Sequence, residues 1–217
     1  MLFSSLVRLV SVSVLSSSVA FGIPLETRES SITCTNSFNT NWHLIQHNTN
    51  SQNDRPAGFV SARDSNGYLE LTTSVGGVPT SSNLLFTFYT CQSSVMPSQT
   101  HSIGNGVTRY YGTLRPSGHQ QNCVTFLRNN SNPKQYKPLV SLDCPVVDNS
   151  GLIYSWWSLD VGPSGPANLR LVGYTKGSGA SNLPPVVFNN FAVGNANVVE
   201  ASYSSTSTGY TLQLTKA

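Results

Sequence analysis

The chain has 217 residues, of which 38% are hydrophobic and 10% are charged, and its formal net charge is +3. This length is sufficient for a hydrophobic core and suits one large all-β domain or two small ones; we expect one. Ser, Thr, Asn and Gly are abundant, which is typical of secreted β proteins with many turns. No cluster of Lys and Arg forms a basic stripe, so nucleic acid is not an expected partner.

Residues 1–22 have the features of a secretory signal peptide. Arg8 is followed by an apolar, Ser-rich run that ends in small-x-small patterns, and we expect cleavage between Ala20 and Ile23. A membrane anchor is the alternative, but serines interrupt the run and it is too short to span a bilayer. The sequence therefore predicts a secreted, extracellular protein with no membrane attachment after cleavage.

Residues 23–55 form an N-terminal segment that we expect to be irregular apart from its first strands. Its WHLIQH run places His43 and His47 four residues apart, and on a helix this spacing would put both side chains on one face, as in some metal sites. However, the run alternates like a strand and has no third ligand nearby. We expect a strand here, and neither a metal nor a cofactor.

Two stretches, residues 56–111 and 112–161, share a layout of short β-like runs separated by Gly, Pro, Asn and Ser. Three landmark pairs recur at offsets of 53 to 55 residues: Gly58 and Gly112, Tyr68 and Cys123, and Cys91 and Cys144. An offset this steady indicates duplicated four-stranded units.

A third unit is less regular. Its predicted strands lie at residues 168–172, 185–188, 197–201 and 210–214, between strong Gly and Ser turn signals. Three units of four short strands predict an all-β fold, a β-trefoil, with residues 56–217 as the remainder of a single domain. In this fold residues 210–214 would close the barrel against an early strand.

Four cysteines allow three disulfide pairings in an oxidising compartment. Cys123 and Cys144 fall in neighbouring strands of one unit, so we expect them to pair, which leaves Cys34 for Cys91. A zinc site is the alternative, but the chain has no CxxC pair and no His at ligand spacing from a cysteine.

The aromatic run at residues 154–159, YSWWSL, is a candidate ligand site. On a strand Trp157 would face the core, while Tyr154 and Trp156 would face the other way and could stack against a sugar ring. Asp148 and Asn149 lie just before them and carry groups that bond hydroxyls. The alternative is that both aromatic side chains belong to core or rim packing.

The order of these runs resembles the ricin-B-type lectin repeat, especially in small secreted fungal proteins: a Gly-x-Leu strand, a strand with Cys, an apolar strand ending in Cys, and an aromatic strand. Members of that family carry Gln-x-Trp on the fourth strand, and this chain keeps the tryptophan without the glutamine. The resemblance implies a β-trefoil that binds carbohydrate.

No GxSxG, HExxH or P-loop motif is present, and no carboxylate pair stands in a recognisable glycosidase motif, so we expect no enzyme activity. Asn129 begins an N-glycosylation sequon, as in a secreted glycoprotein. The expected function is non-catalytic binding of a glycan or cell-wall polysaccharide. Two alternatives are a secreted protease inhibitor acting through residues 92–106, and a structural or effector-like protein without a small ligand.

Overall fold

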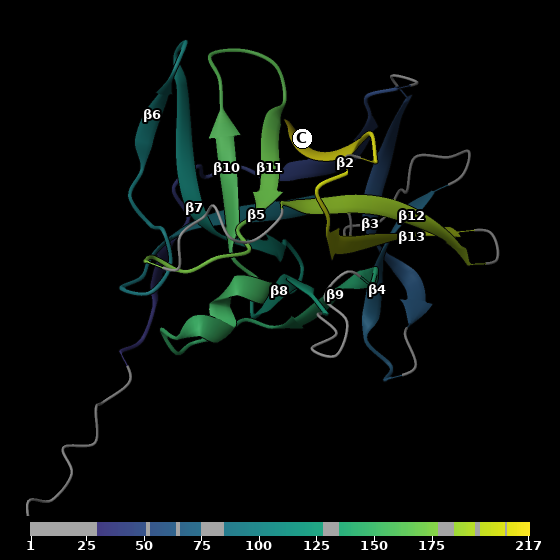
Figure 1. Cartoon of the computed structure of the whole chain (residues 1–217), viewed down its shortest axis with the longest axis horizontal. Coiled ribbons are helices and arrows are strands. Elements are labelled where there is room, and N and C mark those ends of the chain that lie inside the picture. The colour runs from purple at the N-terminus through teal and green to yellow at the C-terminus, as the bar shows by residue number, and fades with distance from the viewer. Residues whose placement is uncertain are drawn as a thin grey trace, which may run out of the picture.

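The computed structural model describes residues 30–50, 53–63, 66–74, 85–127, 135–177, 185–193, 196–206 and 208–217. These residues form an all-β fold with one short helical segment, the 3-10 helix η2 (Ser150–Tyr154) (Figure 1). The strands are β1 (Thr33–Thr35), β2 (Trp42–Asn48), β3 (Asn53–Arg63), β4 (Leu69–Ser74), β5 (Leu85–Gln92), β6 (His101–Gly104), β7 (Val107–Pro116), β8 (Asn122–Phe126), β9 (Lys137–Asp143), β10 (Trp157–Val161), β11 (Ala167–Leu171), β12 (Val186–Val193), β13 (Ala196–Tyr203) and β14 (Tyr210–Lys216).

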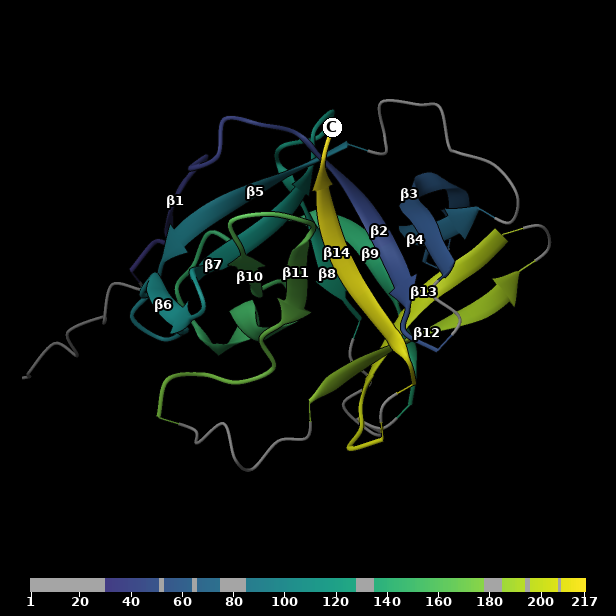
Figure 2. The same ribbon diagram turned by 90° about the horizontal axis from the view of Figure 1, so that it is seen from above.

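Six of these strands close into a barrel. Around the ring, β2 pairs with β5, β5 with β7, β7 with β10, β10 with β11, β11 with β14, and β14 with β2, always antiparallel. Figure 2 shows β14, the last strand, lying between β11 and β2. The prediction that residues 210–214 close the barrel against an early strand is therefore confirmed.

Three antiparallel strand pairs lie outside the ring: β3 with β4, β8 with β9, and β12 with β13. They meet one another, because β4 pairs with both β13 and β9, and β13 also pairs with β9. Each pair lies in the chain between two barrel strands. The chain therefore repeats one pattern, barrel strand, outer pair, barrel strand, over β2–β5, β7–β10 and β11–β14.

The repeat predicted from sequence spacing is one strand out of phase with this pattern. Gly58 lies in the outer strand β3, whereas its predicted counterpart Gly112 lies in the barrel strand β7. The first predicted unit, which was expected to start at Pro56, begins inside β3. The strands are short and similarly spaced, so a shift by one strand leaves the offsets almost unchanged. The first three strands of the second unit and the four strands of the third were predicted at the positions where they are found.

The barrel interior is filled by alternate side chains of its strands. Trp157 and Leu159 on β10 face inward, and Trp157 stacks on Phe188 with ring centroids 6.4 Å apart. The indole Nε1 of Trp157 donates to the carbonyl oxygen of Val124 at 2.9 Å, so its polar atom is satisfied in the core. The prediction that Trp157 belongs to the core is confirmed by its exposure of 0%.

Gly112 allows β5 and β7 to approach each other closely. A Cβ atom at this position would lie 1.8 Å from the carbonyl oxygen of Tyr89 on β5. On its other side Gly112 is paired with Trp157 of β10. A side chain at residue 112 would therefore disrupt the barrel beside its largest core residue.

Both predicted disulfides are present. Cys34–Cys91 joins β1 to β5, and Cys123–Cys144 joins β8 to the residue that follows β9. The expected signal peptide, residues 1–22, and the sequon at Asn129 lie outside the described residues. Within the described part of the chain, no helix has the length and apolar character needed to cross a membrane.

The strand predicted through Tyr154 and Trp156 is not formed. Residues Ser150–Tyr154 are helical and β10 begins only at Trp157, so the strict alternation assumed for Trp156 does not apply. Trp156 is 0% exposed and packs in a second cluster with Met96 and Leu152.

We predict that Trp156→Ala and Trp157→Ala will each lower the free energy of unfolding by about 3 to 5 kcal/mol, because each leaves a large buried cavity. Denaturant unfolding followed by circular dichroism measures both. Ile103→Ala serves as the control because Ile103 is 42% exposed, and its cost should stay below about 1 kcal/mol. A wild-type midpoint for Trp156→Ala would contradict its burial.

Removing the Cys123–Cys144 bridge with paired alanine substitutions should cost about 2 to 5 kcal/mol, because the bridge restricts the unfolded chain. The cysteines of this bridge are 21 residues apart, and those of Cys34–Cys91 are 57 apart. If the entropy of the unfolded chain dominates, removing the Cys34–Cys91 bridge, which closes the longer loop, should lower the free energy of unfolding by about 1 kcal/mol more than removing Cys123–Cys144. The urea unfolding midpoints of the two double variants show which bridge stabilises the protein more. A larger loss of stability without Cys123–Cys144 would show that chain entropy does not dominate.

Candidate ligand-binding site

The structure does not present Trp156 as a stacking surface. Its side chain is fully buried, and its Nε1 donates to the carbonyl oxygen of Pro97 at 2.8 Å. Tyr154 is half-buried and packs against the main core. The exposed pair expected from strand alternation is therefore wrong for Trp156, because the helical turn before β10 directs this side chain under the segment that follows β5.

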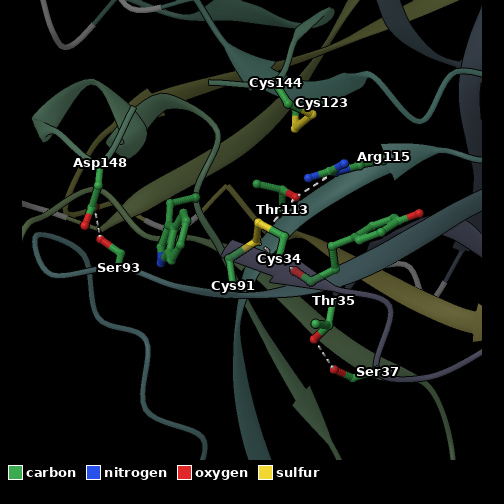
Figure 3. Close-up of a disulfide and its surroundings, with 12 residues drawn as sticks. Cys34, Thr35, Ser37, Cys91, Ser93, Thr113, Arg115, Cys123, Cys144 and Asp148 are labelled. Carbon is green, nitrogen blue, oxygen red and sulfur yellow. Dashed lines mark hydrogen bonds between the residues drawn. A yellow bond between two sulfur atoms is a disulfide. The ribbon is translucent and has the colours of Figure 1, made fainter. Parts of the chain in front are cut away.

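Asp148 and Asn149 are occupied by contacts within the protein. The Asp148 carboxylate accepts a hydrogen bond from the Ser93 hydroxyl (Figure 3). It also accepts hydrogen bonds from the Ser94 backbone N–H at 2.6 Å and from the Ser94 hydroxyl at 2.8 Å. Asn149 caps η2 by accepting from the Gly151 N–H at 2.8 Å. Burial alone would raise the pKa of Asp148, but the hydrogen bonds from Ser93 and Ser94 outweigh it and hold the pKa below its usual value.

These contacts anchor the first half of residues 92–106, the segment considered as an inhibitory loop. Lys176 Nζ also donates to the Ser93 carbonyl oxygen at 2.7 Å and to the Ser98 hydroxyl at 3.3 Å. Beyond this anchor, β6 pairs with β7, and residues 101–106 are exposed at the projecting end of this hairpin (Figure 1). Residues 101–106 therefore lie in the longest continuously exposed stretch that this segment offers to a partner protein.

A cleft of about 670 Å³ is lined by residues of β7, β10, β11 and β14 and by the start of β12, and its floor includes the core residues Leu169, Leu171, Leu212 and Phe188. Its lining residues combine arginine, tyrosine, amide and hydroxyl side chains with an apolar floor: Arg109, Tyr111, Ser158, Asn168, Leu169, Arg170, Leu171, Val172, Gly173, Tyr174, Pro185, Val186, Val187, Phe188, Ser205, Thr208, Tyr210, Thr211 and Leu212. Volume and composition are those of a small-molecule site.

An ion pair forms one wall of this cleft. Arg109 on β7 is bonded through two nitrogens to Asp160 on β10, with Nε–Oδ1 at 2.6 Å and Nη2–Oδ2 at 2.7 Å. These bonds raise the pKa of Arg109 above its usual value, although partial burial opposes the shift. The Asp160 side chain is only 5% exposed, and such burial is tolerated because the charge is paired. The pair gives the wall a fixed geometry.

Further polar side chains continue from this pair across the sheet in register. Asp160 stands opposite Asn168 of β11, and Asn168 stands opposite Gln213 of β14, whose Nε2 donates to Asn168 Oδ1 at 3.3 Å. A second row consists of Tyr111, Ser158 and Arg170 on β7, β10 and β11. We call these two rows the polar ladder; it covers the outer face of the strands that bury Leu159 inside.

Tyrosines supply the aromatic surfaces of the cleft. Tyr111, Tyr174 and Tyr210 all line it, and Tyr111 is also stacked on His101 of β6 with centroids 6.0 Å apart. Burial raises the pKa of the Tyr111 phenol, and the neighbouring Tyr174 adds to the shift. The Tyr111 phenol is therefore neutral near pH 7 and able both to donate and to accept hydrogen bonds.

The sequence contained a partial signal for this site that was not used. Polar–apolar–polar triplets occur in β7, β10 and β11, as Arg109-Tyr110-Tyr111, Ser158-Leu159-Asp160 and Asn168-Leu169-Arg170. Each triplet indicates a strand with one polar face. That the three triplets lie side by side depends on barrel pairing, which no local pattern reveals.

A second hollow, of about 550 Å³, lies beside the two disulfides and is lined by Arg115, Asp143 and Val146 among others. The Arg115 guanidinium lies 4.2 Å from the centre of the Tyr89 ring, and Figure 3 shows it between the disulfides. Burial lowers the pKa of Arg115. Its Nε donates to Thr113 and its Nη1 to the Gln120 carbonyl oxygen, so the side chain is held in place.

Within the described residues, no three His, Cys, Asp or Glu side chains come together as a metal site would require. His43 and His47 lie on the strand β2, as predicted, and His47 Nδ1 contacts Asp54 on β3. No known family model matches this chain, and no curated protein matches its sequence.

Asp148→Asn should destabilise the protein by about 1 to 3 kcal/mol near pH 7, because it removes the charged acceptor of the Ser93 and Ser94 bonds. The native pKa is depressed, so this contribution is complete above the unfolded pKa of about 3.9 and is lost as pH falls through the lower folded value. The stability gap between wild type and variant should therefore narrow below about pH 4.

Urea unfolding at about pH 7, 4 and 2.5 measures this gap. Asp143→Asn is the control, since Asp143 is exposed, and its effect should be small at every pH. A gap for Asp148→Asn that is the same at all three pH values would show that the carboxylate charge contributes nothing.

Proposed function

We propose that this protein is a secreted, non-catalytic carbohydrate-binding protein with a β-trefoil fold of the ricin-B-like class. The threefold pattern of barrel strand, outer pair and barrel strand supports the trefoil, as do the mutual contacts of the three outer pairs. Two disulfides support an extracellular location, because such bonds persist in oxidising compartments.

The observation that carries the proposal is the cleft lined by β7, β10, β11, β14 and the start of β12. A sugar offers an apolar C–H face and a ring of hydroxyls, and it needs an aromatic surface beside fixed donors and acceptors. Tyr174 and Tyr210 supply the aromatic surface. Arg170, Asn168 and Ser158 supply the hydrogen-bond donors and acceptors. The cleft therefore replaces Tyr154, Trp156, Asp148 and Asn149 as the expected sugar site.

A single open site of this kind should bind weakly. We expect about −4 to −6 kcal/mol per site, which corresponds to millimolar to high micromolar dissociation constants. Useful retention would then require a multivalent surface such as a cell-wall polysaccharide.

A glycan array followed by calorimetric titration of the mature protein tests the proposal. Asn168→Ala and Tyr210→Ala should each weaken binding by about tenfold, a loss of about 1.4 kcal/mol, because each removes one contact of the cleft. Gln92→Ala is the matched control, since it removes an exposed amide outside the cleft. If a folded sample gives no heat of binding with any sugar at concentrations of tens of millimolar, the proposed carbohydrate-binding function is rejected, while the description of the fold is unaffected.

Protease inhibition is a second candidate, favoured by the exposed tip of the β6–β7 hairpin, where Ile103 is 42% exposed. A panel of secreted proteases assayed with the mature protein separates the two functions. Inhibition that is lost in Ile103→Asp and retained in Asn168→Ala would favour this candidate over the cleft.

A further inference from the structure

The cleft contains more positive charge than its own acid neutralises. Arg109 and Asp160 form a closed, two-bond pair, and Asp160 is 5% exposed. Arg170 lines the same cleft, with its Nε 4.0 Å from Asp160 Oδ2, a distance too long for a hydrogen bond. Its side chain is 66% exposed and is therefore accessible to a ligand in solution.

No other acid compensates for Arg170. Among the described residues that line the cleft, none is Asp or Glu, and Asp160 lies directly behind them. The one acid in residues 177–215 is Glu200. It lies on β13 outside the cleft lining, in register with Pro138 of β9, and it interacts with Lys137. Lys176 is held away by its bonds to Ser93 and Ser98. The cleft therefore carries a net charge of about +1 beside its apolar floor.

The chemistry of Arg170 narrows the choice of ligand. A guanidinium offers parallel N–H donors that match the two oxygens of a carboxylate or of a sulfate ester. Asn168 and Ser158 flank Arg170 on β11 and β10, where they can bond neighbouring hydroxyls.

We infer that the cleft prefers anionic sugars, those that carry a carboxylate or a sulfate ester, over neutral sugars of the same shape. This inference rests on the proposed carbohydrate-binding function and specifies its ligand class. Arg170 is the residue that sets the preference, while the Arg109–Asp160 pair holds the wall in place.

The test is a calorimetric titration of the mature protein with two matched ligand pairs: trigalacturonic acid and its methyl ester, and a sulfated oligosaccharide and its desulfated form. At low salt the anionic member of at least one pair should bind about tenfold more tightly, which equals about 1.4 kcal/mol. The preference should shrink in about 0.5 M salt, because the charge at Arg170 is exposed. The pair that shows it identifies the anion as carboxylate or sulfate.

Arg170→Gln should remove most of this preference, and Arg170→Lys should keep part of it, because lysine retains the charge without the planar fork. Lys216→Gln is the matched control: it removes the same charge at an exposed residue outside the cleft and should leave the preference unchanged. Equal affinity for anionic and neutral members, or a preference that survives Arg170→Gln, would overturn the inference while the carbohydrate function stands. Failure to bind any of the four ligands or any array glycan would overturn both.

Discussion

The pairing of β2 with β14 is the constraint on which the rest of the structure depends. Seven residue pairs join Trp42–Asn48 to Tyr210–Lys216, so the last strand of the chain completes a ring that begins with one of the first. Without it, both strands would present unpaired backbone groups at open edges. Closure also fixes β11 beside β14, and therefore fixes the cleft, whose wall these two strands share.

The core and the polar ladder occupy the two faces of the same strands. Leu159 and Leu169 point inward while Asp160, Asn168 and Arg170 belong to the outer polar ladder. Because side chains alternate along a strand, a one-residue slip between β10 and β11 would expose the core residues and bury the ladder at once. Burial of the apolar row thus sets the register that aligns the polar row.

Much of the fold could be predicted from the sequence, but little of the candidate ligand-binding site could. Turn residues and short apolar runs predicted most strands of the last two units, and the cysteine positions predicted both disulfides. These signals are local. The phase of the repeat, the helical turn at Ser150–Tyr154 and the burial of Trp156 depend on which segments pack together, and strand propensity alone misplaced all three. The polar ladder could not be predicted either, because it forms only when β7, β10 and β11 pair side by side in one register.

The placement of the aromatic side chains has a consequence for optical measurements. The three tryptophans, Trp42, Trp156 and Trp157, are at most 3% exposed, whereas the aromatic residues in the cleft are all tyrosines apart from Phe188 in its floor. Indole emission should therefore be that of a dry interior and should report whether the barrel is intact. A ligand that fills the cleft without disturbing the core would leave this emission nearly silent, and its binding would be seen in the tyrosine signal or in heat.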